Sequence, residues 1–246
     1  MVSKVLRILE ILHGSSEGLP LKHIAEQTAL NKSTAYRFLA HLESEGYVFR
    51  DDLGAYTIGL KLIRLGSGAT FQATIRKISR PILQKLSRDT GESVNLAILD
   101  GQEVLYLDVI ESAHSFRLVS QVGMHRPLYC TALGKVLLAN LSEEESNQLI
   151  SSISFERFTP HTLTKPNKLK KELASVRQSG YALDNQEAVL GSRCVAAPIF
   201  DETSKAAAAI SVSGPVTRVS LEKARIFGAE ARKAARVISA RFGYSD

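Results

Sequence analysis

The sequence contains few of the residues and motifs that define several large classes of protein. Of its 246 residues only Cys130 and Cys194 are cysteines, too few for a disulfide framework or a zinc cage of thiolates. No run approaches the ~20 apolar residues that cross a bilayer, and no small-residue cleavage site follows the apolar patch near the N-terminus. These absences predict a soluble, cytoplasmic protein with two buried free thiols.

The sequence also lacks the short motifs of common enzymes. It contains neither a GxGxxG nor a P-loop motif, and its histidines form no HxH or HExxH arrangement. Cys130 with His125 is one conceivable reactive pair, and Cys194 with Asp184 is another, but neither has a spacing that such chemistry requires. We therefore predict no catalysis, no cofactor and no resident metal. A small-molecule-transforming enzyme that uses Cys194 and Asp184, or adventitious zinc at that pair, stays as an alternative.

Positive charge is concentrated in the middle of the chain. The net charge is +6, and residues 1–60 contain six Lys and Arg against seven Asp and Glu. Residues 61–90 contain seven against one, and the remainder contains 18 against 17. A basic protein attracts anionic partners, nucleic acid among them. An N-terminal part that binds DNA would therefore need a few well-placed cations and help from the segment that follows it.

The first 60 residues predict three helices followed by a hairpin. The third helix begins after Asn31, whose side chain can accept from the free amide of Ser33 or Thr34, and it stops around Gly46. Two β-prone runs then flank the short loop 51–54. Helix, turn, helix and hairpin is the order of a winged helix-turn-helix domain.

The outward face of this third helix predicts DNA contact. It carries small and polar residues, where a merely solvated face more often has long Glu and Lys side chains. The N-terminal amides, hydroxyls and cation suit phosphate oxygens, Tyr36 and Arg37 can reach base edges, and Arg50 can contact the backbone or minor groove. The predicted DNA-binding residues are Lys32, Ser33, Thr34, Tyr36, Arg37 and Arg50. A helical bundle used for dimerisation is the alternative.

The rest of the chain predicts a helical connector and an α+β domain. Leu60 to about Thr90 has a helical pattern, although two glycines and Pro81 weaken it. Beyond it, apolar runs predict two strands around Asp100-Gly101 and further strands at 115–121, 181–187, 192–201 and 206–215. Helices are predicted at 131–141, after the Ser142 capping box, before Gly180 and at the C-terminus. This half is therefore a sheet domain covered by helices.

A sparse set of polar residues interrupts the apolar strands of this domain. Ser211 and Ser213 are two apart on one strand and share a face, so their hydroxyls could orient a ligand. Satisfaction by neighbouring backbone in a packed sheet is the alternative. Gly134 and Lys135 open a helix whose amides could receive a carboxylate, or they serve only packing and solvation.

Several segments resemble the IclR family of bacterial transcriptional regulators. The DNA-binding domain of that family is similar to "LPLKHIAEQTALNKSTAYRFLAHLESEGYVFRD" and "YTIGLKLIRLG". The resemblance continues in "RDTGESVNLAILDG", "LYCTALGKVLLA", "GYALDNQEAVLGSRCVAAPIFD" and "AAISVSGP". It implies a winged helix-turn-helix domain at 1–59, a linker helix at 60–78 and a GAF-like mixed α/β effector-binding domain at 79–246. It also implies homodimers joined largely through the N-terminal half, often paired into tetramers.

The resemblance further implies an effector site. Carried over residue by residue, the contacts of glyoxylate- and pyruvate-binding members fall on Ala132, Leu133, Asp184, Cys194, Ser211 and Ser213. Those members have a smaller pair at 132–133, so the bulk of Leu133 disfavours a two-carbon acid and suits a larger ligand. An ionised Asp184 would repel an acid, so it is protonated, bonded to Arg193 or backbone amides, or an acceptor for a ligand hydroxyl. The acceptor role is the one we predict, and with it a hydroxylated carboxylic acid.

Together these features predict a DNA-binding transcriptional regulator, with a repressor as the expectation. Its affinity for double-stranded operator DNA is expected to depend on a small carboxylate-containing metabolite, and the connector from Leu60 to Thr90 is expected to transmit the signal. A ligand-independent architectural DNA-binding protein is the alternative. It is disfavoured because it would not need a sheet domain of roughly 150 residues.

Overall fold

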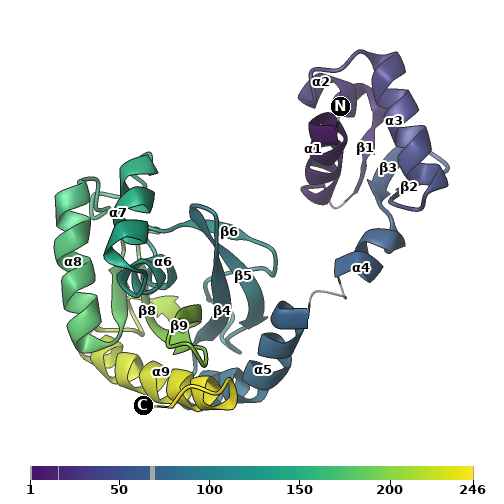
Figure 1. Cartoon of the computed structure of the whole chain (residues 1–246). Helices are drawn as coiled ribbons and strands as arrows, with labels where there is room; N and C mark the ends of the chain where they lie inside the picture. The colour runs from purple at the N-terminus through teal and green to yellow at the C-terminus, as the bar shows by residue number, and fades with distance from the viewer. Residues whose placement is uncertain (1, 16, 67–69, 246) are drawn as a thin grey trace. The chain divides into compact units, whose positions relative to one another are not determined.

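The chain folds as two units in a computed structural model, which describes residues 2–15, 17–66 and 70–245 (Figure 1). One unit is Met1–Ala73 and the other is Thr74–Asp246. The division falls within the segment 60–78 that the sequence predicts as a linker, and the predicted domain boundaries themselves stay a prediction. Each unit is described by itself below.

The N-terminal unit has the predicted winged helix-turn-helix order. Its elements are α1 (Val2–His13), β1 (Leu19–Pro20), α2 (Leu21–Gln27), α3 (Lys32–Ser44), β2 (Val48–Arg50) and β3 (Ala55–Ile58). Strand β1 was not predicted. It pairs with β3 and extends the hairpin into a sheet of order β1-β3-β2.

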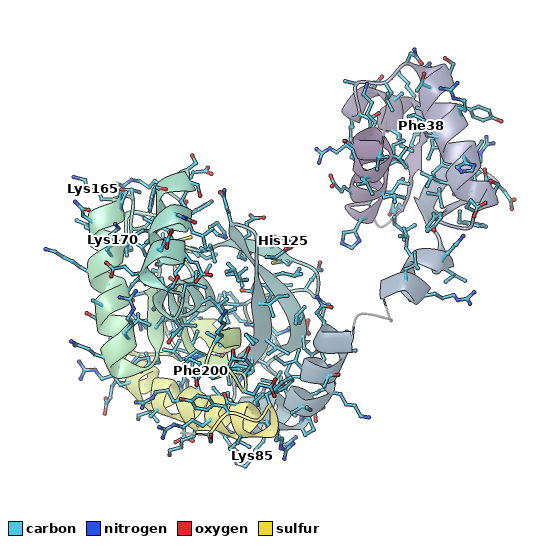
Figure 2. All side chains as sticks on the ribbon, in the orientation of Figure 1. Phe38, Lys85, His125, Lys165, Lys170 and Phe200 are labelled. Atoms are coloured by element: carbon cyan, nitrogen blue, oxygen red, sulfur yellow. The ribbon has the colours of Figure 1, made fainter. Side chains whose placement is uncertain are left out.

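Burial of one side of each helix holds this unit together. Ile8 and Leu12 of α1, Ile24 of α2 and Leu39 of α3 are buried against Tyr56 of β3. The partly buried Phe38 packs against the same cluster (Figure 2). Because these side chains recur at helical spacing, their burial leaves the opposite face of α3 to solvent.

Two helices follow the wing, α4 (Leu60–Gly66) and α5 (Thr70–Thr90). The sequence predicts one helical segment from Leu60 to about Thr90, and residues 67–69 lie outside the described residues. Pro81 lies inside α5. Among the described residues no helix is both long enough and apolar enough to cross a membrane.

The C-terminal unit is a mixed α/β domain built on one antiparallel sheet of order β6-β5-β4-β9-β8-β7. Its strands are β4 (Ser93–Asp100), β5 (Glu103–Ile110), β6 (His125–Pro127), β7 (Ala182–Asn185), β8 (Ser192–Phe200) and β9 (Ala206–Pro215). Its further helices are α6 (Ala132–Ala139), α7 (Glu143–Ser152), α8 (Pro166–Ser179) and α9 (Leu221–Arg241).

The strand predicted at 115–121 is wrong. That segment is a loop, and the edge strand beside β5 is β6 instead. Tyr106 of β5 donates its amide to the carbonyl of Met124, so the edge is already occupied by the chain that leads into β6. The apolar residues of the loop are partly solvated, since Phe116 and Val119 are exposed. A strand-like pattern without a free sheet edge does not make a strand.

Helices cover both faces of the sheet (Figure 1). On one face, residues such as Leu96 and Ile210 pack with side chains of α5 and α9. On the other, Ala97, Ala196 and Ala209 pack with α6 and α8. The small alanines let the apolar helix α6 approach the sheet closely. The face beneath α6 carries the candidate effector residues.

Candidate functional site

The predicted DNA-contacting residues of α3 lie on its solvated face. Lys32, Ser33 and Arg37 are exposed, and Tyr36 is 51% exposed. The guanidinium carbon of Arg37 is 6.0 Å from the ring centroid of Phe38, at the outer limit of a cation–π contact. Tyr36 and Arg37 are adjacent and exposed on α3, so both side chains can enter a major groove with this helix.

The first turn of α3 is capped as the sequence predicts. The Oδ1 of Asn31 accepts from the amide of Thr34 at 2.9 Å and from the hydroxyl of Ser33 at 3.1 Å. The Thr34 amide is therefore used within the cap, which corrects the expectation that the amides of this turn are free. Thr34 keeps its hydroxyl, and Lys32 keeps its cation, for an external contact.

Arg50 lies at the end of β2, where the wing turn begins. Its side chain is exposed, and its guanidinium carbon lies 5.4 Å from the ring centroid of Tyr56. Asp51 shapes the turn by accepting from the amides of Leu53 and Ala55 at 3.0 and 2.8 Å. Leu53 is 95% exposed at the tip. The wing thus presents a cation beside a protruding, ordered turn.

All six predicted effector residues line one cavity in the C-terminal unit. Its volume is ≈ 70 Å³, several times the space that one water molecule requires. Strand register explains the convergence, because Asp184 pairs with Cys194 and Cys194 pairs with Ser213, which places all three on one face. Ser211 follows on that face, and Ala132 and Leu133 reach the cavity from the start of α6.

The two serine hydroxyls are held by a side chain that sequence reasoning missed. The Nδ2 of Asn95, buried on β4, donates to the Oγ of Ser211 at 3.1 Å and of Ser213 at 3.3 Å. The alternative of backbone partners is therefore wrong for this contact. Each Oγ accepts from Asn95, and the two hydroxyls lie 3.4 Å apart, so one of them can also donate to the other. The only sequence signal for Asn95 was an amide within an apolar run.

Asp184 is buried and bonded to backbone. Its Oδ1 accepts from the amide of Glu187 at 2.7 Å, whereas Arg193 donates to the Oδ1 of Asn185 at 2.8 and 2.9 Å. Of the alternatives for Asp184, the bond to Arg193 is thus wrong, because Asn185 and Arg193 pair on the opposite face of the sheet, whereas the bond to a backbone amide is present. Burial raises the pKa of Asp184 to about 7, against the opposing effect of the Glu187 amide. The carboxyl can exist in either protonation state near neutral pH.

Both thiols are poor nucleophiles at neutral pH. Burial raises the pKa of Cys194 to about 12 and that of Cys130 to about 12, with the charge of Asp184 adding to both. Cys130 is fully buried, whereas Cys194 is partly exposed, which corrects the expectation of two buried thiols. His125 bonds to the Oδ2 of Asp100 at 2.9 Å on the surface (Figure 2). Within the described ranges, no three His, Cys, Asp or Glu side chains are grouped to hold a metal.

Comparison with known proteins identifies the family. The family described as "IclR helix-turn-helix domain" matches residues 1–52, and "Bacterial transcriptional regulator IclR C-terminal" matches residues 68–240. The chain belongs to the IclR family of bacterial transcriptional regulators. It is 35% identical over 245 residues to the Transcriptional repressor IclR of Escherichia coli (strain K12), covering 98% of this chain and 89% of that protein.

Solved structures agree with this membership. The IclR of Thermotoga maritima is 35% identical, with a TM-score of 0.80 over 99% of this chain and 98% of that chain. An IclR homologue complexed with 4-hydroxybenzoate, from Microbacterium hydrocarbonoxydans, has a TM-score of 0.89 and covers 99% of both chains. At 24% identity the second similarity shows the shared fold. This IclR-family chain is therefore a DNA-binding transcriptional regulator.

In this IclR-family regulator, α6 does not present Lys135 to the cavity. Lys135 is fully buried, and its Nζ lies 2.6 Å from the Oε1 of Glu187 and 3.4 Å from the Oε1 of Glu172. The amide of Gly134 donates to the Oγ1 of Thr131 at 3.1 Å. Of the two alternatives that the sequence left open at Gly134 and Lys135, the structure favours packing over a carboxylate contact, because both groups have partners within the protein.

The Lys135–Glu187 pair holds a wall of the cavity in place. Glu187 belongs to the β7–β8 loop, and its amide is the donor to Asp184. Its carbonyl accepts from the hydroxyl of Thr162 at 2.7 Å. The next residues of the loop, Ala188 and Val189, line the cavity. One buried ion pair therefore fixes both the loop and the hydrogen bond that Asp184 receives.

Several further residues of the cavity escaped sequence reasoning. They come from β5, the loop 111–124, β6, the start of α6, the β7–β8 loop and the start of β8: Tyr106, Leu118, Val119, Ser120, Arg126, Thr131, Ala188, Val189 and Ser192. Arg126 carried no signal, because its strand was not predicted. Its position became apparent only with the pairing of Val104 and Arg126 between β5 and β6.

Proposed function

We propose that the chain is a repressor whose affinity for double-stranded operator DNA depends on a small hydroxylated carboxylic acid bound in the cavity of the C-terminal unit. The convergence of the six effector residues on one partly polar cavity is the observation that carries this proposal. A few polar groups within apolar walls are typical of a small-molecule site. The repressor role is supported by the related Escherichia coli protein, which is a transcriptional repressor.

In this proposal the N-terminal unit reads DNA through α3 and the wing. Tyr36 and Arg37 contact base edges, whereas Lys32, Ser33 and Thr34 contact phosphates. Arg50 contacts the backbone or the minor groove. The boundaries proposed are 1–59 for this domain, 60–78 for the linker and 79–246 for the effector domain. The protein acts in the cytoplasm as a homodimer, or as a pair of dimers.

The effector changes operator affinity through two arrangements of the dimer that it binds unequally. The coupling available is about 1–3 kcal/mol, or 5- to 150-fold in operator affinity. The segment of α4 and α5 connects the two units and is the proposed transmitter. No catalytic step is part of the proposal, since thiols with pKa values of about 12 supply no nucleophile at neutral pH.

Replacing Arg37 by Ala is expected to reduce discrimination between operator and random DNA by roughly 1–3 kcal/mol. The exposed guanidinium makes base contacts in the proposal, and its loss leaves no buried group without a partner. Fluorescence anisotropy with both DNAs at one salt concentration measures the difference. The matched control is Arg7→Ala on α1, also exposed and outside α3. Unchanged selectivity of the Arg37 variant would remove α3 as the reading helix.

The double variant Ser211→Ala with Ser213→Ala is expected to weaken effector binding about thirtyfold, since two hydrogen bonds at about 1 kcal/mol each are lost. Calorimetry with a panel of hydroxylated acids, including sugar acids and 4-hydroxybenzoate, gives the affinities. DNA binding without effector should stay near the parental level, because the serines lie in the other unit. Parental affinity of the double variant for the acid that binds best would take the serines out of the site.

A further inference from the structure

The cavity contains a cation that the protein itself does not neutralise. Arg126 lies on β6, is partly buried and lines the cavity. In the part of the chain that the structure describes, its guanidinium makes no hydrogen bond or ion pair. The other deeply placed arginines differ, because Arg218 is paired with Glu92 and Arg193 with Asn185. A partly desolvated guanidinium without a partner is costly unless a ligand anion completes it.

The charge of Arg126 reaches the interior of the cavity. It lowers the pKa of Tyr106 and of Cys194, although burial raises both pKa values overall. Both side chains line the same cavity. The positive end of the cavity therefore lies at β6.

The acidic end of the cavity lies on the opposite edge strand. Asp184 belongs to β7, whereas Arg126 belongs to β6, at the other end of the sheet order. Both residues line one cavity without joining in an ion pair among the described residues. The space between them is left for a molecule with an anionic group at one end and a hydrogen-bond donor at the other.

We infer that Arg126 binds the effector carboxylate and so determines specificity, orienting the acid with its carboxylate toward β6 and its hydroxyl toward Asp184. This rests on the proposed function of the cavity and adds to it the recognition of the anionic group. The planar guanidinium can donate two parallel hydrogen bonds to a carboxylate. Asp184 then accepts from the hydroxyl and need not meet the anion, which removes the repulsion expected between the two carboxylates.

The test compares each acid with its uncharged amide. The probes are 4-hydroxybenzoate with 4-hydroxybenzamide and gluconate with gluconamide, measured by calorimetry on the full chain. We expect the parental protein to bind at least one acid about 10- to 100-fold more tightly than its amide. Arg126→Gln should lose that preference while its affinity for the amide changes little. Arg126→Lys should keep part of it, because the charge remains and the paired donors are lost.

Two outcomes would overturn the inference: a parental protein that prefers no acid over its amide, or an Arg126→Gln variant that keeps the parental preference. Thermal unfolding without ligand checks that each variant is folded. The double serine variant separates this inference from the proposed function. Weakened binding there, with an unchanged preference in Arg126→Gln, refutes only the role of Arg126. Parental binding of the acid by both variants refutes the cavity as the effector site.

Discussion

Replacing Lys135 by Met is expected to destabilise the C-terminal unit by about 3–5 kcal/mol at neutral pH, the usual cost of removing one partner of a buried ion pair. Lys135 is fully buried, and its Nζ is 2.6 Å from Glu187. Met fills a similar volume, so the loss is mainly electrostatic. Among the described residues the second oxygen of Glu187 has no hydrogen-bond partner, so removal of the lysine leaves this carboxylate poorly compensated. Denaturant unfolding measures the change.

The destabilisation should depend on pH with a definite sign. Burial raises the pKa of Glu187 in the parental protein, and Lys135 opposes that rise. Without the lysine, the pKa in the folded state rises further above the unfolded value, and protonated Glu187 is the form that burial tolerates. Folding is then most favourable in acid and loses stability as the pH rises through the folded pKa. The cost of Lys135→Met should therefore be smallest below the ordinary Glu pKa and grow toward neutral pH.

Two further variants make this prediction specific. Adding Glu187→Gln to Lys135→Met should recover most of the lost stability, because neither member of the pair is then charged. The control is Lys170→Met on α8, whose side chain is exposed (Figure 2). We expect it to change stability by less than about 0.5 kcal/mol. A Lys135→Met protein that is as stable as this control would contradict the assignment of a structural ion pair.

Replacing Gly134 by Ala is expected to destabilise the same unit by about 3 kcal/mol, the upper part of the usual range for overpacking. An added Cβ would overlap the backbone carbonyl of Leu128, which has no flexible end that can move aside. The helix α6 would have to shift away from the chain that precedes it. Since Ala132 and Leu133 on α6 line the cavity, effector affinity should fall as well.

A matched control separates overlap from the general effect of an alanine. Gly14→Ala, at the end of α1, meets only ordinary contact with the carbonyl of Ile11. Its stability should stay within about 1 kcal/mol of the parental value. Calorimetric unfolding follows both variants. If Gly134→Ala unfolds at the parental temperature and binds the effector normally, the close packing of α6 on this segment is not a requirement of the site.

Local sequence signals were sufficient to predict most helices and strands of the fold. The cap at Asn31, the capping box of Ser142 with Glu145 and the left-handed Gly180 each mark a helix end within a few residues, and the structure contains all three. The turn at Gly101 likewise separates β4 from β5. Each signal depends on hydrogen bonds between residues close in sequence, so a single sequence contains the information.

The pairing and register of strands that are distant in the chain could not be predicted from the sequence in the same way. The segment 115–121 has a strand-like pattern, yet β5 pairs with β6, and this choice depends on residues distant in the chain. The same applies to Arg193, which bonds to Asn185 because β7 and β8 pair in one register and not the next. Asn95 and Arg126 joined the candidate site only through such pairings. The roles of the six effector residues came from family resemblance and stay predictions until binding is measured.

The position of the cavity between the two edge strands has a consequence for local opening of the domain. Strand β6 pairs only with β5, and strand β7 only with β8, in the described sheet. Edge strands, which are hydrogen-bonded to one neighbour only, open first, and their amides exchange with solvent fastest. A molecule bound to Arg126 and Asp184 would link the two edge strands, β6 and β7, and so oppose the opening of either strand. Effector binding should then slow amide exchange in β6 and β7 together, more than in the central strands β4 and β9.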